Sequence, residues 1–363
     1  MDHYYPRLLL NETICKTNIA TMAKKARLNN VIFRPHFKTH QSDAVAQWFK
    51  DEGVEAITVS SLKMATYFAA AGWTDIFIAF PVNLLEINAI NRLASQIELS
   101  VSVESEHSAR HLARHLNSKV GVYIKIDTGY HRTGLELADL GVIHKILAVL
   151  DESGKMMFRG FYTHSGHTYS ARDTAEITSI FGDARDQLGE LHARFSAHYP
   201  DLVLSVGDTP SCSLISDFDG LDEIRPGNFV FYDLMQHRLG ACMIDQIAVA
   251  LECPVVAKNS RRNELLIHGG AVHLSKEAMI YKGEKTHGLV APIIQSGWGS
   301  PLENTFLASL SQEHGIIRAD HRTFDSIRIG DTLAILPVHS CLTANLADHY
   351  LTPDGRTLAK MRS

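Results

Sequence analysis

Short apolar runs alternate with longer segments of helical periodicity over the first two thirds of the chain. The runs are rich in β-branched residues, which favours strands, and they lie at 31–37, 56–60, 75–81, 97–103, 120–127, 157–164, 202–207 and 223–232. Helical patterns fill most of the intervals, among them 42–51, 61–70, 84–94 and 174–198. Repetition of strand and helix predicts parallel βα units, and eight of them predict a closed (β/α)8 TIM-like barrel.

The pattern changes after about residue 245. Strand-like segments at 247–257, 264–273, 288–294 and 332–336 are separated by turns rather than by helices. This predicts a smaller, mostly antiparallel β domain. The apolar run 7–10 precedes the first barrel helix and is expected to pair with this domain. The predicted division is therefore a barrel of residues 11–245 and a β domain made of residues 1–10 and 246–363.

Composition narrows the class of protein. The 363 residues are 45% hydrophobic and 21% charged, as in an ordinary globular protein, and the net charge is −5. No basic cluster indicates nucleic-acid binding, and no apolar run is long enough to cross a bilayer. The opening residues lack the pattern of a signal peptide, and five scattered cysteines do not form a disulfide framework. We therefore expect a cytoplasmic location.

Lys38 follows the first predicted strand, in the run Arg-Pro-His-Phe-Lys-Thr-His at 34–40. In a barrel this position lies at the C-terminal mouth, where catalytic groups are found. A lysine that forms a Schiff base must lose its proton near neutral pH, which burial and neighbouring cations promote. The residues alone leave Lys38 either as such a nucleophile or as a surface lysine. A metal pair of His36 and His40 is disfavoured, because Pro35 indicates extended chain rather than a helix.

Two loops after the seventh and eighth strands have the composition of a phosphate site. One contains Thr209 among small and hydroxyl residues, and the other contains Gly227 and Asn228. Barrels bind phosphate at these two loops, and a glycine lets the backbone approach an anion. Simple turns would have a similar composition, so both interpretations stay open.

The fifth and sixth strands end in cationic and aromatic residues. Arg132 offers a fixed fork that suits a phenolate or a carboxylate. Tyr162 and Tyr169 lie in the segment 161–169, which ends the sixth strand. A separate set of three histidines shares one predicted helix face, where interleaved arginines favour a solvated surface over a metal site: His107, His111 and His115.

His339 and Cys341 follow a late predicted strand. In an extended segment, residues two apart point to the same side. Imidazole and thiolate together suit zinc, and two protein ligands would leave positions open for water or substrate. The alternative is that Cys341 is simply a small buried residue.

Taken in order, these motifs resemble those of the fold-type III pyridoxal-phosphate (PLP) enzymes. The resemblance covers nearly the whole chain and falls in the branch that contains D-serine dehydratase, D-threonine aldolase and D-threo-3-hydroxyaspartate dehydratase. It implies an alanine racemase-like barrel, Lys38 as the Schiff-base residue and Arg132 as a contact to the cofactor ring oxygen. It also implies a metal pair, His339 and Cys341, and further cofactor contacts by Tyr162, Tyr169, Thr209, Gly227 and Asn228.

Two further segments bear on this resemblance. Asp208 stands where the family often has serine or threonine. A carboxylate beside a phosphate is unfavourable, so Asp208 is expected to point away or to accept a hydrogen bond. Residues 311–315 also resemble a family segment, with no role assigned to them.

The His-x-Cys pair favours dehydration, because the aldolases of this branch more often have His-x-Asp. The expected function is a PLP- and divalent-metal-dependent lyase that converts D-serine or D-threo-3-hydroxyaspartate to a 2-oxo acid and ammonia. Zinc is the expected metal, with manganese or another divalent ion as alternatives. Two other activities stay open: aldolase-type cleavage of D-threonine to glycine and an aldehyde, and racemisation. A homodimer is expected, and the β domain with its metal pair disfavours a non-enzymatic cofactor carrier.

Overall fold

A computed structural model describes residues 5–361 of the chain. One of its sheets has eight parallel strands, in the order β2-β9-β8-β7-β6-β5-β4-β3. A parallel bridge between His36 and Thr58 joins the two ends of this order, so the sheet closes into the predicted barrel. The strands are β2 (Ile32–Phe33), β3 (Ala56–Val59), β4 (Asp75–Pro81), β5 (Glu98–Val103), β6 (Val120–Lys125), β7 (Met156–Tyr162), β8 (Val203–Val206) and β9 (Glu223–Ile224).

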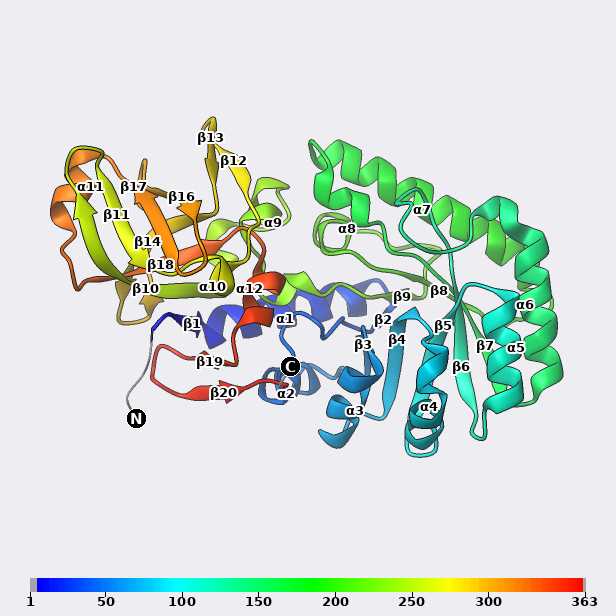
Figure 1. Ribbon diagram of the computed structural model, residues 1–363. Coiled ribbons are helices and arrows are strands. Elements are labelled where there is room, and N and C mark those ends of the chain that lie inside the picture. The colour runs from blue at the N-terminus through cyan, green and yellow to red at the C-terminus, as the bar shows by residue number, and fades with distance from the viewer. Residues whose placement is uncertain (1–4, 362–363) are drawn as a thin grey trace. The chain divides into compact units, whose positions relative to one another are not determined.

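Helices alternate with these strands along the chain. Figure 1 shows α4 to α7 on the outside of strands β4 to β8. Several helices begin at a side chain that accepts a backbone N–H of the first turn, such as Ser61, Ser105 and Asp173. The helices are α1 (Glu12–Leu28), α2 (Asp43–Lys50), α3 (Leu62–Ala70), α4 (Ile87–Ala94), α5 (Glu106–His115), α6 (Leu140–Ser153), α7 (Thr174–Phe195), α8 (Thr209–Leu214) and α9 (Leu234–Arg238).

The first and last barrel strands are shorter than the apolar runs that predicted them. β2 has two residues and β9 has two, against predicted runs of 31–37 and 223–232. Pro35 and Pro226 interrupt these runs, and a proline has no N–H to donate to a neighbouring strand. After Pro226 the chain turns into a short 3-10 helix, η4 (Asn228–Val230), instead of extending the strand.

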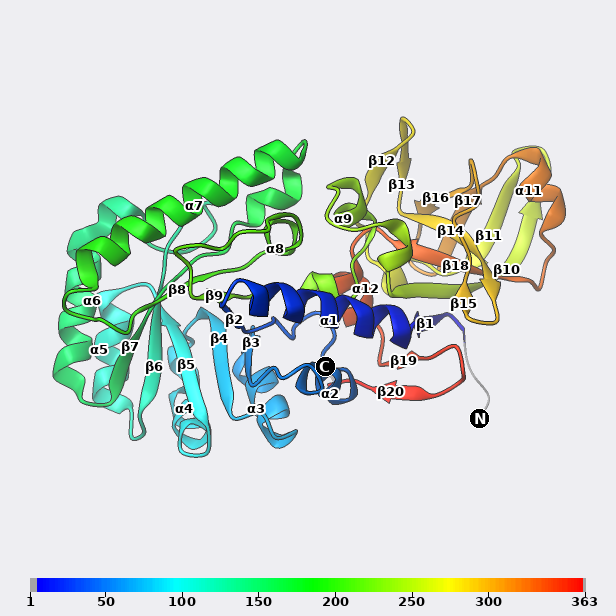
Figure 2. The same ribbon diagram turned by 180° about the vertical axis from the view of Figure 1, so that it is seen from behind.

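The second large sheet is mostly antiparallel, as predicted. Arg7–Leu10 forms β1 and pairs with β10, with Leu8 opposite Leu251, so the expected pairing of the opening run is confirmed. Figure 2 shows this sheet from behind, with β15 beside β14. Its strands are β10 (Val249–Asn259), β11 (Glu264–His268), β14 (Gly288–Ile294), β15 (Gly297–Trp298), β16 (Phe306–Leu310), β17 (His314–Arg318), β18 (Thr332–Pro337), β19 (His349–Leu351) and β20 (Thr357–Ala359).

The remaining elements of this part are short. β12 (Met279–Tyr281) and β13 (Glu284–Thr286) form a separate hairpin. The predicted strand at 264–273 ends at His268, because the chain then enters a helical turn. The short helices are α10 (Ala271–Leu274), α11 (His321–Ser326) and α12 (Ser340–Leu346).

The chain separates into two compact units, each built from more than one segment. One contains residues 21–38 and 49–227, and the other contains 1–20, 39–48 and 228–363. The division predicted at residues 10 and 245 stays a prediction, and residues 1–4 and 362–363 of the predicted β domain lie outside the described residues. Within residues 5–361, no helix is both long enough and apolar enough to cross a membrane.

Candidate functional sites

Lys38 lies in a turn at the end of the first barrel strand. The preceding residue, Phe37, is fully buried and packs against Phe68 and Trp73, with ring centres 4.9 Å and 5.0 Å away. This anchor fixes the turn, while the side chain of Lys38 is exposed. Phe37 also donates its N–H to the carbonyl of Thr58, which ties the turn to β3. Lys38 therefore lies in a turn after a barrel strand, the position that the sequence predicted for it.

Two histidines share the electrostatic environment of Lys38. Burial lowers the pKa of His36 and of His164 well below the usual value, and the positive charge of Lys38 lowers both further. The charges of Arg132 and Arg225 act in the same direction. Both imidazoles are therefore neutral at physiological pH, in a region that is already rich in cations.

Arg132 is presented by a turn that Asp127 holds together. The Asp127 carboxylate accepts the backbone N–H groups of Gly129, Tyr130 and His131 at 2.9–3.0 Å. Gly134 closes this turn with φ of +120°, and a Cβ there would lie 2.8 Å from the Asp127 nitrogen. The guanidinium of Arg132 lies 4.9 Å from the centre of the Tyr130 ring.

The two predicted cofactor-facing tyrosines differ in surroundings. Tyr162 is buried inside the barrel with Phe77 and Tyr123, and its hydroxyl donates to Ser102 at 2.8 Å. Burial raises the pKa of Tyr162, so it stays a neutral phenol. Tyr169 is half-buried, and its hydroxyl accepts the backbone N–H of Thr209 at 3.4 Å.

Asp208 behaves as expected from its position beside the predicted phosphate loop. It caps α8, accepting the N–H of Ser211 at 2.7 Å, and it accepts the Thr168 hydroxyl at 3.0 Å. Burial raises the pKa of Asp208 to about 6, although these hydrogen bonds oppose the shift. The Asp208 carboxylate therefore accepts hydrogen bonds from the protein itself, as expected.

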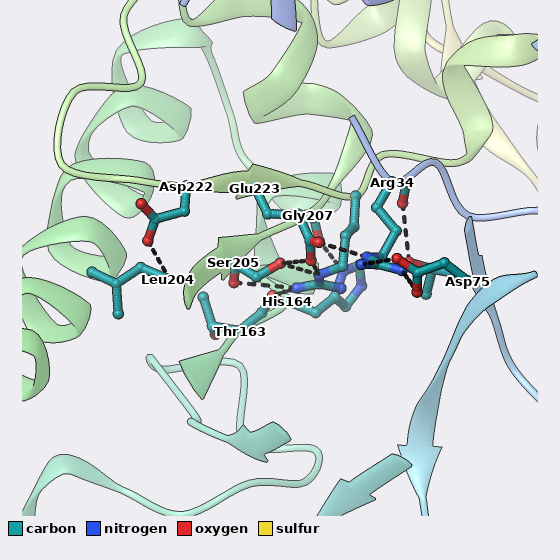
Figure 3. Close-up of polar contacts among 11 residues, drawn as sticks. Arg34, Asp75, Thr163, His164, Leu204, Ser205, Gly207, Asp222 and Glu223 are labelled. Atoms are coloured by element: carbon teal, nitrogen blue, oxygen red, sulfur yellow. Dashed lines mark hydrogen bonds and ion pairs between the residues drawn. The ribbon is translucent and has the colours of Figure 1, made fainter. Parts of the chain in front are cut away.

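The barrel interior contains a chain of buried charges that the sequence did not reveal. Arg34 donates to Glu223 at 2.5 Å and to both carboxylate oxygens of Asp75. The other oxygen of Glu223 accepts the Ser205 hydroxyl at 2.6 Å, and Ser205 in turn accepts from Arg225 at 2.6 Å. Most of this chain can be followed in Figure 3. Arg34 thus contacts the Glu223 carboxylate directly, and Arg225 contacts it through the Ser205 hydroxyl.

Arg225 ends this chain. Its guanidinium donates to the carbonyl of Thr163 and lies 4.8 Å from the centre of the Tyr162 ring. Burial lowers the pKa of Arg225, yet an arginine remains charged at any physiological pH. In this loop the sequence pattern pointed only to Gly227 and Asn228. The feature that could have revealed Arg225 is its position directly after a barrel strand, on the same side as Glu223 two positions earlier.

His339 and Cys341 lie together where β18 leads into α12. His339 precedes the first residue of α12, and Cys341 is the second residue of the helix. The two side chains influence each other's protonation. Burial alone would lower the pKa of His339, but Cys341 raises it to about 9, and His339 lowers the pKa of Cys341 against the effect of burial. An imidazole and a thiol that favours its anion form a donor pair suited to a divalent metal.

Other polar groups surround the Cys341 sulfur. The hydroxyl of Thr39 lies 3.2 Å from it, and the amide nitrogen of Asn228 lies 3.3 Å from it. Both residues lie in the same compact unit as Cys341, and Thr39 directly follows Lys38 in the chain. The side chain of Asn228 therefore contacts Cys341, one of the two residues predicted to bind a metal, while the predicted contact of Asn228 with a phosphate stays a prediction.

Comparison with known proteins agrees with this geometry. The family described as the alanine racemase N-terminal domain matches residues 12–234, and the putative serine dehydratase domain matches residues 248–352. The chain belongs to the fold-type III PLP enzymes, in the branch that pairs these two domains.

Within that class, the chain is similar to two dehydratases over almost its whole length. It is 31% identical to D-threo-3-hydroxyaspartate dehydratase of Delftia sp. strain HT23, over 96% of this chain and 94% of that one. It is 28% identical to D-serine dehydratase of Dictyostelium discoideum, over 95% and 92%. The solved structure of the Delftia enzyme has a TM-score of 0.91 and covers 99% of this chain and 98% of its own.

Two further structures concern variants of that Delftia enzyme. In one a cysteine is replaced by alanine and the enzyme is in its metal-free form; in the other a histidine is replaced by alanine. The two changed residues lie two positions apart, as His339 and Cys341 do. The chain is thus a PLP-dependent lyase by family, and a metal cofactor is in keeping with its donor pair.

Proposed function

We propose that this chain is a dehydratase of β-hydroxy D-amino acids, acting on D-serine or D-threo-3-hydroxyaspartate to give a 2-oxo acid and ammonia. The observation that carries the proposal is the pair His339 and Cys341, with the thiol further held by two hydrogen-bonding side chains. A pair of this kind suits a metal that binds a substrate hydroxyl. The dehydratase relatives support the same reaction.

The donor groups fit both cofactors. When bound, PLP supplies an electron sink at Cα and the metal supplies a Lewis acid for the β-hydroxyl. Lys38 is the proposed attachment point, and its amine then serves as the general base that removes the Cα proton. Arg132, Tyr162 and Tyr169 are the proposed side-chain contacts to PLP, and Thr209, Gly227 and the main chain of Asn228 are its proposed phosphate contacts. His36 and His164 are uncharged, so neither competes with Lys38 for a negatively charged group.

We propose zinc as the metal. Thiolate and imidazole ligands favour zinc over magnesium or calcium, which prefer oxygen. Metal analysis of the purified protein tests this assignment: about one zinc per chain is expected, and a Cys341→Ala variant should lose it. Manganese at the same stoichiometry would contradict the identity of the metal but not the site.

A product assay tests the reaction. D-serine, D-threonine and D-threo-3-hydroxyaspartate are supplied in turn, and 2-oxo acid, ammonia, glycine and aldehyde are measured. We expect 2-oxo acid with equimolar ammonia. Glycine with an aldehyde would replace the dehydratase by an aldolase, and inverted amino acid without either product would replace it by a racemase. Chelation should abolish activity, and zinc should restore it.

Borohydride reduction followed by peptide mapping tests the cofactor attachment. The pyridoxyl group is expected on the peptide that contains Lys38. Lys25 provides an internal control, because its amine donates to the carbonyls of Cys212, Ser213 and Ile215 and is not available for the aldehyde. A label on any other lysine would overturn the assignment. A Lys38→Ala variant should lose about 10²–10⁴-fold or more in turnover.

Three further features are part of the proposal. We propose a barrel of residues 11–245 and a β domain of residues 1–10 and 246–363, a division that the separation into a parallel and a mostly antiparallel sheet supports. A homodimer is tested by sedimentation, in which a single species of twice the chain mass is expected. A cytoplasmic location is supported by the free thiols of Cys15, Cys212, Cys242, Cys253 and Cys341.

A further inference from the structure

Asn228 makes an unusual set of contacts for a residue in a phosphate loop. Its side-chain nitrogen is buried and lies 2.7 Å from an Asp233 carboxylate oxygen, 3.0 Å from the Ser340 hydroxyl and 3.3 Å from the Cys341 sulfur. The residue is 4% exposed. An amide nitrogen has two hydrogens, so these three acceptors share them.

Asp233 fixes which way the amide faces. If the amide were reversed, its oxygen would stand 2.7 Å from a carboxylate oxygen, where two acceptors repel each other. Asp233 is itself held in place: one oxygen caps α9 through the N–H of Gln236 at 2.9 Å, and the other accepts the N–H of Ser340 at 2.9 Å. The amide nitrogen therefore has to face Ser340 and Cys341.

This orientation has two consequences at Cys341. An N–H donor directed at sulfur stabilises a thiolate and fixes the direction of its remaining lone pairs. The amide oxygen of Asn228 faces away from Asp233 and has no hydrogen-bond partner among residues 5–361. A buried acceptor without a partner costs free energy, so this oxygen favours a donor from a bound molecule.

We propose that the Asn228 side chain is a positioning residue for the metal-binding thiolate, locked in its orientation by Asp233. The inference rests on the proposed metal pair. It assigns the side chain of Asn228 to the metal ligand rather than to the cofactor phosphate. The main-chain N–H of Asn228 remains the proposed contact to the phosphate. Groups that orient a metal ligand typically contribute 10–100-fold to metal affinity.

Zinc affinity, measured alongside PLP affinity, tests the proposal. PLP-loaded enzyme is stripped of metal with a chelator, and zinc is titrated in competition with a fluorescent zinc indicator. PLP affinity is measured separately by equilibrium dialysis. For Asn228→Ala we expect zinc affinity to fall about 10–100-fold with PLP affinity unchanged. Asp233→Asn should also weaken zinc binding, because both amide orientations then become available to Asn228.

Asn18→Ala is the matched control. Asn18 is buried to a similar degree, and its amide donates to the carbonyls of Val230 and Gln246. This variant should keep the zinc affinity of the wild type. Circular dichroism shows whether each variant folds, and Asp233→Asn, which preserves volume, provides the test if Asn228→Ala does not fold.

Three outcomes would overturn the proposal and are distinguishable. If Cys341→Ala weakens zinc binding but Asn228→Ala and Asp233→Asn do not, the positioning role is wrong while the metal pair stands. The same holds if Asn228→Ala weakens PLP binding instead. If Cys341→Ala binds zinc as tightly as the wild type, the proposed metal pair is itself wrong, and the role of Asn228 fails with it.

Discussion

The hydroxyl of Thr39 lies 3.2 Å from the sulfur of Cys341, although 302 positions separate the two residues in the chain. Thr39 directly follows Lys38, so one peptide bond joins the proposed cofactor lysine to a residue that contacts the proposed metal ligand. A change at Thr39 would therefore alter the surroundings of the Cys341 sulfur.

Replacing Thr39 with valine tests the contact. Valine keeps the shape of the side chain and removes the hydroxyl, so the thiolate loses one hydrogen-bonding partner. We expect zinc affinity to fall about tenfold, within the range for groups that orient a metal ligand. Thr39→Ser should restore most of the affinity in the same competition titration. If valine and serine behave alike, the hydroxyl is not what matters.

Asp208 should make stability depend on pH. Burial raises its pKa from 3.8 to about 6, so the folded state binds this proton more tightly than the unfolded state does. Stability from this group is therefore present at low pH and is lost as pH rises from about 4 to about 6. Asp208→Asn keeps an acceptor for the Ser211 N–H but does not titrate.

Urea unfolding of both proteins across that range checks this prediction. The variant's unfolding free energy should rise relative to the wild type by up to about 3 kcal/mol between pH 4 and pH 7. A difference that stays constant with pH would show that Asp208 titrates normally.

Glu223 should be among the most destabilising positions to change in the barrel. It is fully buried and compensates Arg34 directly and Arg225 through Ser205. Glu223→Gln leaves those two guanidinium groups with less negative charge, at an expected cost of about 3–5 kcal/mol. Chemical denaturation measures the loss. Glu106→Gln, in an exposed pair with Arg110, is the control and should cost under about 1 kcal/mol.

Gly166 should not tolerate a methyl group. A Cβ at this position would lie 2.3 Å from the ring of Tyr130, and that ring supports Arg132. Gly166→Ala is expected to cost about 1–3 kcal/mol in stability and to weaken PLP binding by displacing Arg132. Gly182→Ala in α7 is the counterpart: nothing lies within 4 Å of its Cβ, so it should stabilise the helix by about 0.5–1 kcal/mol. Equal effects of the two changes would argue against the clash.

Much of the fold could be predicted because apolar periodicity reports burial. The strand at 75–81 and the pairing of the run 7–10 appear in the structure as expected. The ends of the barrel order could not be predicted in the same way. Around Pro35 and Pro226 the apolar character continues, but a missing N–H stops the strand, and hydrophobicity does not record that loss.

The site was predicted less evenly. Lys38 and the pair His339 and Cys341 stand in local motifs, so the sequence alone is enough to propose them. The contact between Asn228 and Cys341 joins positions 113 apart and depends on how Asp233 turns an amide, which no local pattern expresses. The charge chain from Arg34 to Arg225 was missed for the same reason: its members come from different strands.

The pairing of β1 with β10 has a consequence for synthesis on the ribosome. Arg7 pairs with Glu252, 245 positions later, so β1 emerges long before its partner exists. At the usual rate of about 5–20 residues per second, this delay is on the order of tens of seconds. During that interval the nascent chain bears an open strand edge, while the strands from β2 to β9 can already pair with one another. β1 is therefore translated before the barrel strands but can pair with β10 only after them.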